Sequence, residues 1–214
     1  MKNSRAALIG VAAVGLAWGA IPASPVQAVE KSSSDVHWWW DSTTVTGSST
    51  VVRNEAGITA RLSTSGLTPG DAVTLWFIVF NNPDACASDP CAVPEDLDNP
   101  DTEADFHFAG GHVVGRTGTS TFAGRLNVGE TRRSGLVETG LGAAVPLSNP
   151  LGAQVTLALH SHGPATPGGG LDAQIHSFLG GCTSFNGPNG FAAGFDDLPD
   201  TVGECSTFQY SVHS

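Results

Sequence analysis

The residues best suited to chemistry lie in one short stretch, LHSHGP, at positions 159–164. In an extended strand, side chains two positions apart share a face, so His160 and His162 would present two imidazoles side by side. Neighbouring imidazoles suit copper or zinc if a third ligand converges on them. His176 is the first candidate for that ligand and His112 the second. The pattern therefore predicts a copper or zinc site.

Asp172 could complete this arrangement as a further ligand or as the acceptor that orients an imidazole. The same residues also allow an interpretation without metal. Leu157 and Leu159 would fill the inner face of the strand, which leaves His160 and His162 half-exposed on the polar face of an edge strand. The residues alone leave both interpretations open.

A second candidate site is the aromatic run Trp38-Trp39-Trp40, which follows His37. Neighbouring residues of a strand alternate between its faces, so three consecutive tryptophans cannot all point inward. An outward tryptophan would suit a patch that stacks on sugars or contacts a protein. The alternative is an N-terminal strand that covers one edge of the fold.

Six carboxylates crowd into the segment 95–105, and calcium prefers clustered oxygen ligands of this kind. The segment lacks the glycine and the closing glutamate of an EF-hand loop, and Pro94 and Pro100 flank or interrupt its acidic residues. A solvated acidic loop is therefore favoured over calcium. The chain also has no GxSxG elbow and no phosphate-binding glycine loop. Whether the protein is an enzyme stays open, and a non-catalytic role is favoured.

Residues 1–28 read as a secretory signal, with Lys2 and Arg5 before an apolar stretch and Val26-Gln27-Ala28 at the cleavage position. Cleavage near Ala28 would leave seven basic against twenty acidic residues, a formal charge of −13. Such a surface repels phosphate backbones, which argues against nucleic acid as a partner. No later segment is apolar for long enough to span a membrane. We expect a secreted or extracytoplasmic protein.

The four cysteines of an exported chain predict two disulfides. The favoured pairing is Cys86–Cys91, which closes a tight Asp-Pro loop, and Cys182–Cys205, which brackets a glycine-rich segment. A site of four cysteines around zinc is disfavoured because neither pair has the spacing of a zinc knuckle.

The element that organises the fold is Val73–Phe80, VTLWFIVF, which is apolar on both faces and stops at Asn81-Asn82-Pro83. A strand of this kind is central and covered twice. Around it we predict hairpins over 50–64 and 106–126, with a bulge at Gly110-Gly111, and strands over 155–160 and 207–212. Residues 127–151 are expected to form a surface excursion. Residues 163–170 are expected to form a loop, and 171–179 a short strand or turn.

These elements predict an all-β protein, a single antiparallel β-sandwich of immunoglobulin-like or Greek-key type with long loops. Its domain would span residues 50–214. Residues 29–49, rich in serine, threonine and tryptophan, would precede it as an N-terminal segment.

Several motifs carry a resemblance that spans most of the chain after the signal. Leu67–Gly70 (LTPG), Phe80–Cys86 (FNNPDAC), Ser161–Pro164 (SHGP) and Gly180–Cys182 (GGC) resemble a pattern in exported bacterial β-sandwich proteins of unassigned function. Residues 160–176 also resemble CHRD-type domains and the metal loops of copper–zinc superoxide dismutases. The dismutase pattern has a catalytic arginine near the chain end, whereas the last arginine here is Arg133.

We therefore expect an exported, non-catalytic binding or surface module that acts on a protein or glycan at the cell surface. The alternative is a copper- or zinc-binding protein centred on His160 and His162.

Overall fold

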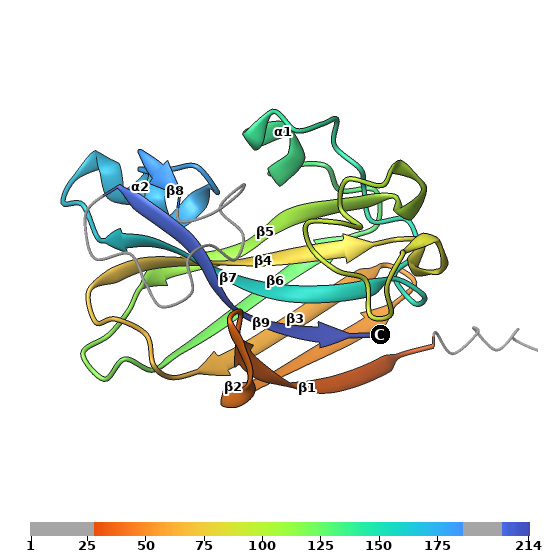
Figure 1. The fold of residues 1–214 in the computed structure, drawn as a ribbon, viewed down its shortest axis with the longest axis horizontal. Coiled ribbons are helices and arrows are strands. Elements are labelled where there is room, and N and C mark those ends of the chain that lie inside the picture. Colours follow the sequence, from red (N-terminus) through yellow and green to blue (C-terminus); the bar gives the residue numbers. More distant parts are fainter. Residues whose placement is uncertain (1–27, 186–202) are drawn as a thin grey trace, which may run out of the picture.

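The structure is a computed structural model that describes residues 28–185 and 203–214 (Figure 1). The expected signal peptide lies outside the described residues except for Ala28, and so does most of the glycine-rich segment between Cys182 and Cys205. The elements are β1 (Glu30–Trp38), β2 (Asp41–Asn54), β3 (Gly57–Thr64), β4 (Asp71–Phe80), β5 (Ala104–Val113), β6 (Ser120–Asn127), α1 (Gly135–Thr139), β7 (Gln154–Pro164), α2 (Gly169–His176), β8 (Ser184–Phe185) and β9 (Glu204–His213). Two 3-10 turns, Pro83–Ala85 and Pro100–Thr102, lie between β4 and β5.

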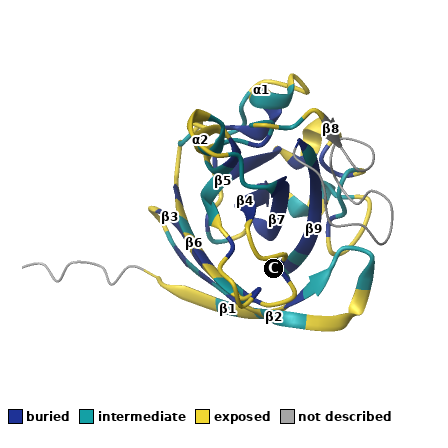
Figure 2. Cartoon of the chain, turned by 90° about the vertical axis from the view of Figure 1, so that its left-hand side faces the viewer, coloured by how far each residue is buried: buried dark blue, intermediate teal, exposed yellow. Residues whose placement is uncertain are grey.

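The strands form one sheet in the order β5-β4-β7-β9-β1-β2-β3-β6, and every pair along this path is antiparallel. The short β8 adds to β9 in parallel. The sheet curls into a nearly closed, barrel-like arrangement, as the end-on view shows (Figure 2). The predicted antiparallel all-β class is thus confirmed.

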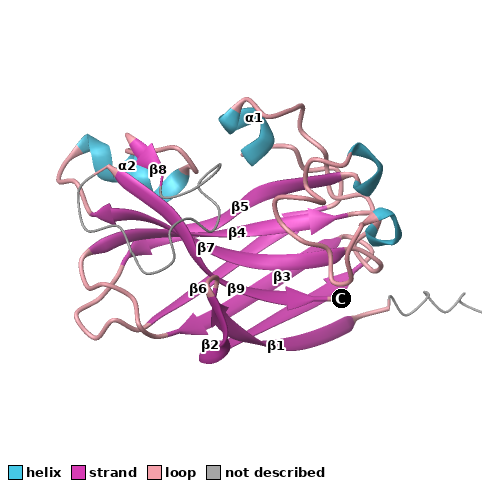
Figure 3. Cartoon of the chain, viewed as in Figure 1, coloured by secondary structure: helices cyan, strands magenta, loops and turns pink. Residues whose placement is uncertain are grey.

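The predicted division into two packed sheets is not what the structure has. The half β5-β4-β7-β9 and the half β1-β2-β3-β6 are joined where His37 and Trp38 of β1 pair with Tyr210 and Gln209 of β9. Because β1 and β9 pair over this short stretch, the two halves are parts of one continuous sheet (Figure 3). Residues 30–49, expected to precede the domain, supply β1 and the first part of β2.

The two edge strands meet where the curled sheet closes. A Cβ atom added at Gly124 of β6 would lie only 2.5 Å from the Cβ atom of Ala109 in β5, so only glycine allows this approach. The predicted hairpin of these two strands is nevertheless wrong. Each strand takes a different partner, because β5 pairs with β4 and β6 pairs with β3. The hairpin predicted over 50–64 is confirmed as β2 and β3.

The prediction for the central strand is confirmed, since all ten residues of β4 are buried. Val73, Leu75, Phe77 and Val79 contribute to the core inside the curled sheet. Trp76, Ile78 and Phe80 contribute to a second core on the outer face of the same strand. A bulge interrupts the pairing of β4 with β5 next to Gly110, as the sequence predicted.

The second core is covered by the segments that carry the two helices. Residues 163–170 were predicted as a loop and 171–179 as a short strand or turn, but α2 occupies residues 169–176. The helix lies so close to the sheet that a Cβ atom added at Gly111 of β5 would clash with the carbonyl oxygen of Ile175. Packing on β5 therefore decides the conformation of a segment whose own helical signal is weak. The helices among the described residues are all too short to cross a membrane.

Candidate functional site

His160 and His162 lie on β7, whose two edges are occupied by β4 and β9. Both side chains are fully buried in the second core. Their ring centroids are 4.9 Å apart, and the ring of His160 stacks on Phe178 at 4.1 Å. The interpretation as half-exposed histidines on an edge strand is therefore wrong. The strand is internal, and the segment after α2 covers its outer face.

A threonine hydroxyl lies within hydrogen-bonding distance of one nitrogen of each ring. Nδ1 of His160 is 3.0 Å from Oγ1 of Thr207 on β9. Nε2 of His162 is 3.2 Å from Oγ1 of Thr74 on β4, and the Trp76 indole donates to the same oxygen at 2.9 Å. The neighbouring strands thus fix the orientation of both imidazoles.

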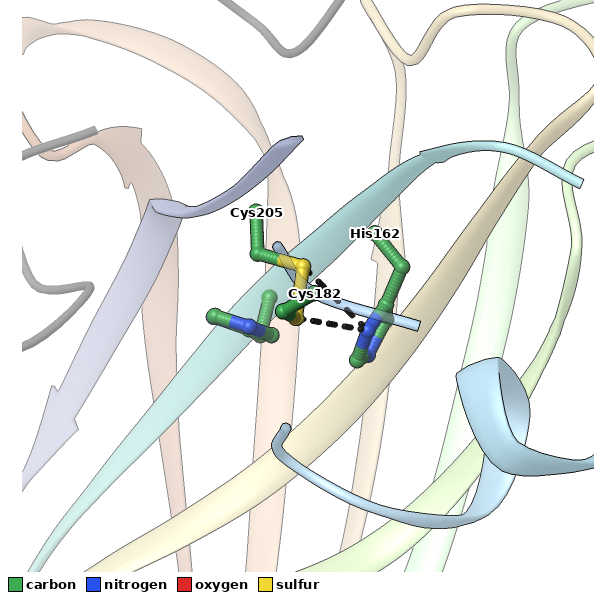
Figure 4. Close-up of side chains that lie close together, drawn as sticks. His162, Cys182 and Cys205 are labelled. Atoms are coloured by element: carbon green, nitrogen blue, oxygen red, sulfur yellow. Dashed lines mark hydrogen bonds between the residues drawn. A yellow bond between two sulfur atoms is a disulfide. The ribbon is translucent and has the colours of Figure 1, made fainter. Parts of the chain in front are cut away.

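The disulfide Cys182–Cys205 lies directly beside His162 (Figure 4). Nδ1 of His162 is 3.5 Å from Sγ of Cys182 and 3.7 Å from Sγ of Cys205. Together with His160, these residues form a group whose ligand-type atoms all lie within 4.8 Å of one another. Both cysteine pairs are the predicted ones, Cys86–Cys91 and Cys182–Cys205.

Burial keeps both imidazoles neutral. Desolvation lowers the pKa of His162 to about 4. It also lowers the pKa of His160 well below its ordinary value, and the neighbouring His162 adds to that shift. A metal would therefore meet two deprotonated rings at neutral pH.

The other two predicted ligands lie outside this group. His176 ends α2 about half-exposed, with Nδ1 3.0 Å from a carboxylate oxygen of Asp172. His112 stacks on Phe122 at 4.3 Å, and its Nε2 is 2.7 Å from Oγ of Ser120. The structure brings the first pair of histidines together with sulfur, not with a third imidazole. The sequence predicted the histidine pair His160 and His162 and the disulfide Cys182–Cys205 separately, and no pattern in it indicated that they lie together.

The three tryptophans divide between two surroundings. Trp38 and Trp40 stack on each other at 4.9 Å and pack on the core inside the sheet. Trp39 lies in the turn after β1, where it packs against the second core and beside Tyr210 at 5.1 Å. These two rings line a hollow of about 230 Å³ whose other lining residues are Pro90, Cys91, Ala92, Val93, Thr156 and Val212. None of these side chains carries a charge.

Within the acidic segment, Asp96 is buried and holds the Cys86–Cys91 loop. Its carboxylate accepts hydrogen bonds from the amides of Ala87 (2.6 Å) and Ala92 (2.8 Å) and from the Ser88 hydroxyl (2.8 Å). Both of its oxygens are therefore engaged by donors of the protein itself.

No family model, curated protein or solved structure gives a significant match to this chain.

Proposed function

We propose that this protein is an exported, non-catalytic binding module that holds an uncharged sugar ring of a glycan against Trp39 and Tyr210. The observation that carries the proposal is the pairing of these two partly exposed rings at an uncharged hollow. Rings of this kind combine an apolar face with a polar edge, which suits the mixed surface of a sugar. Two disulfides fit a compartment outside the reducing cytoplasm, and residues 1–28 fit the signal that would lead there.

The size and charge of the hollow restrict the ligand. At about 230 Å³ it is smaller than the roughly 300–1,000 Å³ of most small-molecule pockets. The hollow therefore suits a single sugar ring of a longer glycan. Binding at one such hollow is expected to be weak. The absence of cationic side chains among its lining residues gives an acidic sugar no counter-charge. A neutral glycan is the ligand that these features favour.

The test is a titration of the protein with neutral cello-, chito- and malto-oligosaccharides, followed by tryptophan fluorescence. We expect a saturable change with one of the series, at least tenfold weaker binding for Trp39→Ala, and partial retention for Trp39→Phe. Val45→Ala, a change at an exposed residue that does not line the hollow, is the matched control and should bind normally.

Trp38→Ala is not a useful variant for this question, because Trp38 packs on the interior core and its loss would disturb folding. A blank response to all three series, or equal binding by wild type and Trp39→Ala, would overturn the proposal. A protein ligand captured at this hollow without any glycan response would do the same.

A further inference from the structure

We propose that His160, His162, Cys182 and Cys205 form a zinc site when the Cys182–Cys205 disulfide is reduced. Their ligand-type atoms lie within 4.8 Å of one another on segments that are distant in sequence. Two thiolates and two imidazoles are the ligand set of closed, four-coordinate zinc sites. The inference is independent of the glycan proposal, since the hollow beside Trp39 involves none of these four residues.

The position of His162 already matches such a site. With Zn–S near 2.3 Å and Zn–N near 2.0–2.1 Å, a tetrahedral ion separates a nitrogen and a sulfur ligand by about 3.6 Å. Nδ1 of His162 lies 3.5 Å from one sulfur and 3.7 Å from the other. The sulfurs must move from bonding distance to about 3.8 Å apart. His160, whose ligand atom lies within 4.8 Å of the others, must come to the separations of about 3.4–3.6 Å that a tetrahedral ion sets.

The surroundings of the imidazoles also suit a metal. Ligating histidines in proteins have a second hydrogen bond that fixes the ring. Here Thr74 lies at the Nε2 atom of His162 and leaves its Nδ1 atom facing the sulfurs, while Thr207 lies at a ring nitrogen of His160. Burial favours the neutral form of both rings, so they can bind zinc without first losing a proton.

Reduction requires an external dithiol, such as a thiol–disulfide oxidoreductase in the organism or dithiothreitol in the laboratory. Its thiolate attacks Sγ of Cys182, which is partly exposed, and releases the thiolate of the buried Cys205. The second thiol of the reductant then displaces Cys182 and closes the reductant's own disulfide. The protein gains two electrons and two protons, and zinc binding to both sulfurs releases those two protons.

The two states exclude each other, because the sulfurs bond either to one another or to the metal. The oxidised protein retains only the two imidazoles as ligands in this group. We therefore expect no zinc binding tighter than micromolar in the oxidised protein. The reduced protein should bind one zinc ion per chain more tightly than micromolar.

The experiment compares oxidised protein with protein reduced by dithiothreitol and freed of reductant without oxygen. Each is titrated with Co²⁺ as a spectroscopic probe and then with Zn²⁺ in competition. The reduced form should show the charge-transfer and intense visible bands of tetrahedral cobalt bound to thiolates, and zinc should displace them. His162→Asn should bind at least 100-fold more weakly.

Two variants serve as matched controls. His213→Asn removes another buried histidine that lies outside the group, and it should keep full binding. Cys86→Ser/Cys91→Ser removes the other disulfide and should also keep it. A reduced wild type without metal uptake, or an unchanged cobalt spectrum in His162→Asn, would overturn the proposal.

The test stays decisive if reduction unfolds the chain. One equivalent of zinc should then restore the native near-ultraviolet circular dichroism of the reduced protein. Cys182→Ser/Cys205→Ser, which lacks both the disulfide and the thiolates, should not respond to zinc. Failure of zinc to restore the reduced wild type would contradict the site.

Discussion

The two disulfides look alike as covalent links but lie in different chemical surroundings. Their Cα–Cα distances are 5.4 Å for Cys86–Cys91 and 5.6 Å for Cys182–Cys205. The first belongs to a loop held by the carboxylate of Asp96. The second lies against the neutral imidazole of His162. Ligand-type atoms surround both disulfides, but both carboxylate oxygens of Asp96 are engaged in holding the first loop. At the second disulfide, a neutral imidazole nitrogen faces the two sulfurs.

The largest expected difference between the two regions is in how much stability each loses when the pH falls. The folded pKa of His162 is about 4, below the ordinary value of 6.5, so the unfolded chain binds the proton first as the pH falls. The stability that His162 contributes is therefore complete above pH 6.5 and is lost between about 6.5 and 4. The loss is about 3 kcal/mol from this residue. His160 is shifted in the same direction.

Asp96 should respond in a lower range. Burial raises the pKa of Asp96, but hydrogen bonds led by the Ala92 and Ala87 amides outweigh burial and lower it below 3.8. Its contribution is present above that value and is lost only as the pH falls further. Hydrogen exchange should thus show β7 losing protection at mildly acidic pH while the Cys86–Cys91 loop keeps it.

Urea unfolding of wild type and His162→Gln between pH 7 and 4.5 tests this contribution. Other groups also contribute to the wild-type curve. Burial lowers the pKa of His213 to about 4 and lowers the pKa values of His107, His112 and His160. Burial raises the pKa of Asp71 to about 6, so this carboxyl opposes the histidines. All of these groups stay in the variant and cancel in the difference except His160, whose pKa is lowered by burial and also by His162, so the difference reports the coupled pair of histidines. Parallel pH profiles for the two proteins would contradict a neutral, buried His162.

Removing each disulfide should have the next largest effect. The chain-entropy estimate gives roughly 3 kcal/mol for Cys182→Ser/Cys205→Ser and roughly 2 kcal/mol for Cys86→Ser/Cys91→Ser, because the closed loops differ in length. The sequence separations are 23 and 5 residues. Urea unfolding at pH 7 in the absence of metal measures both losses. A greater loss from the short loop would mean that its contacts outweigh chain entropy.

The smallest expected loss of stability comes from a change at Asp96, which holds the Cys86–Cys91 loop. Asp96→Asn should cost about 1–2 kcal/mol, because the amide group replaces one acceptor with a donor that faces other donors. Asp98→Asn is the matched control at an exposed neighbour and should leave the free energy of unfolding unchanged. Equal stability of the two variants in urea would show that Asp96 does not organise the loop.

Local sequence patterns predicted the elements whose conformation depends on residues close to them in the sequence. The double apolar face of Val73–Phe80 identified the central strand, because burial on both sides leaves its record in the residues themselves. The hairpin of β2 and β3 was also predicted, because its turn at Asn54–Gly57 is formed by residues that are adjacent in the sequence. Strand alternation also placed His160 and His162 on one face. It does not account for Trp39, which lies in the turn after β1.

Pairings between distant strands were not encoded in any such pattern. The chain order suggested that β5 and β6 pair with each other. Instead β5 pairs with β4 and β6 pairs with β3, and the two strands meet through side-chain stacking of His112 on Phe122 and the close approach of Ala109 to Gly124. The helix α2 likewise depends on Gly111, which lies more than fifty residues before it. Propensity within a short window carries no information about these contacts.

By itself, then, the sequence determined an antiparallel β protein with two disulfides and a pair of histidines on one strand face. Only the tertiary structure decided that the histidines are buried and that Cys205 lies alongside His162. The physical reason is the register of β9 on β7, which sets Thr207 opposite His160. That register depends on side-chain packing across the whole sheet, and no local spacing of histidines and cysteines specifies it.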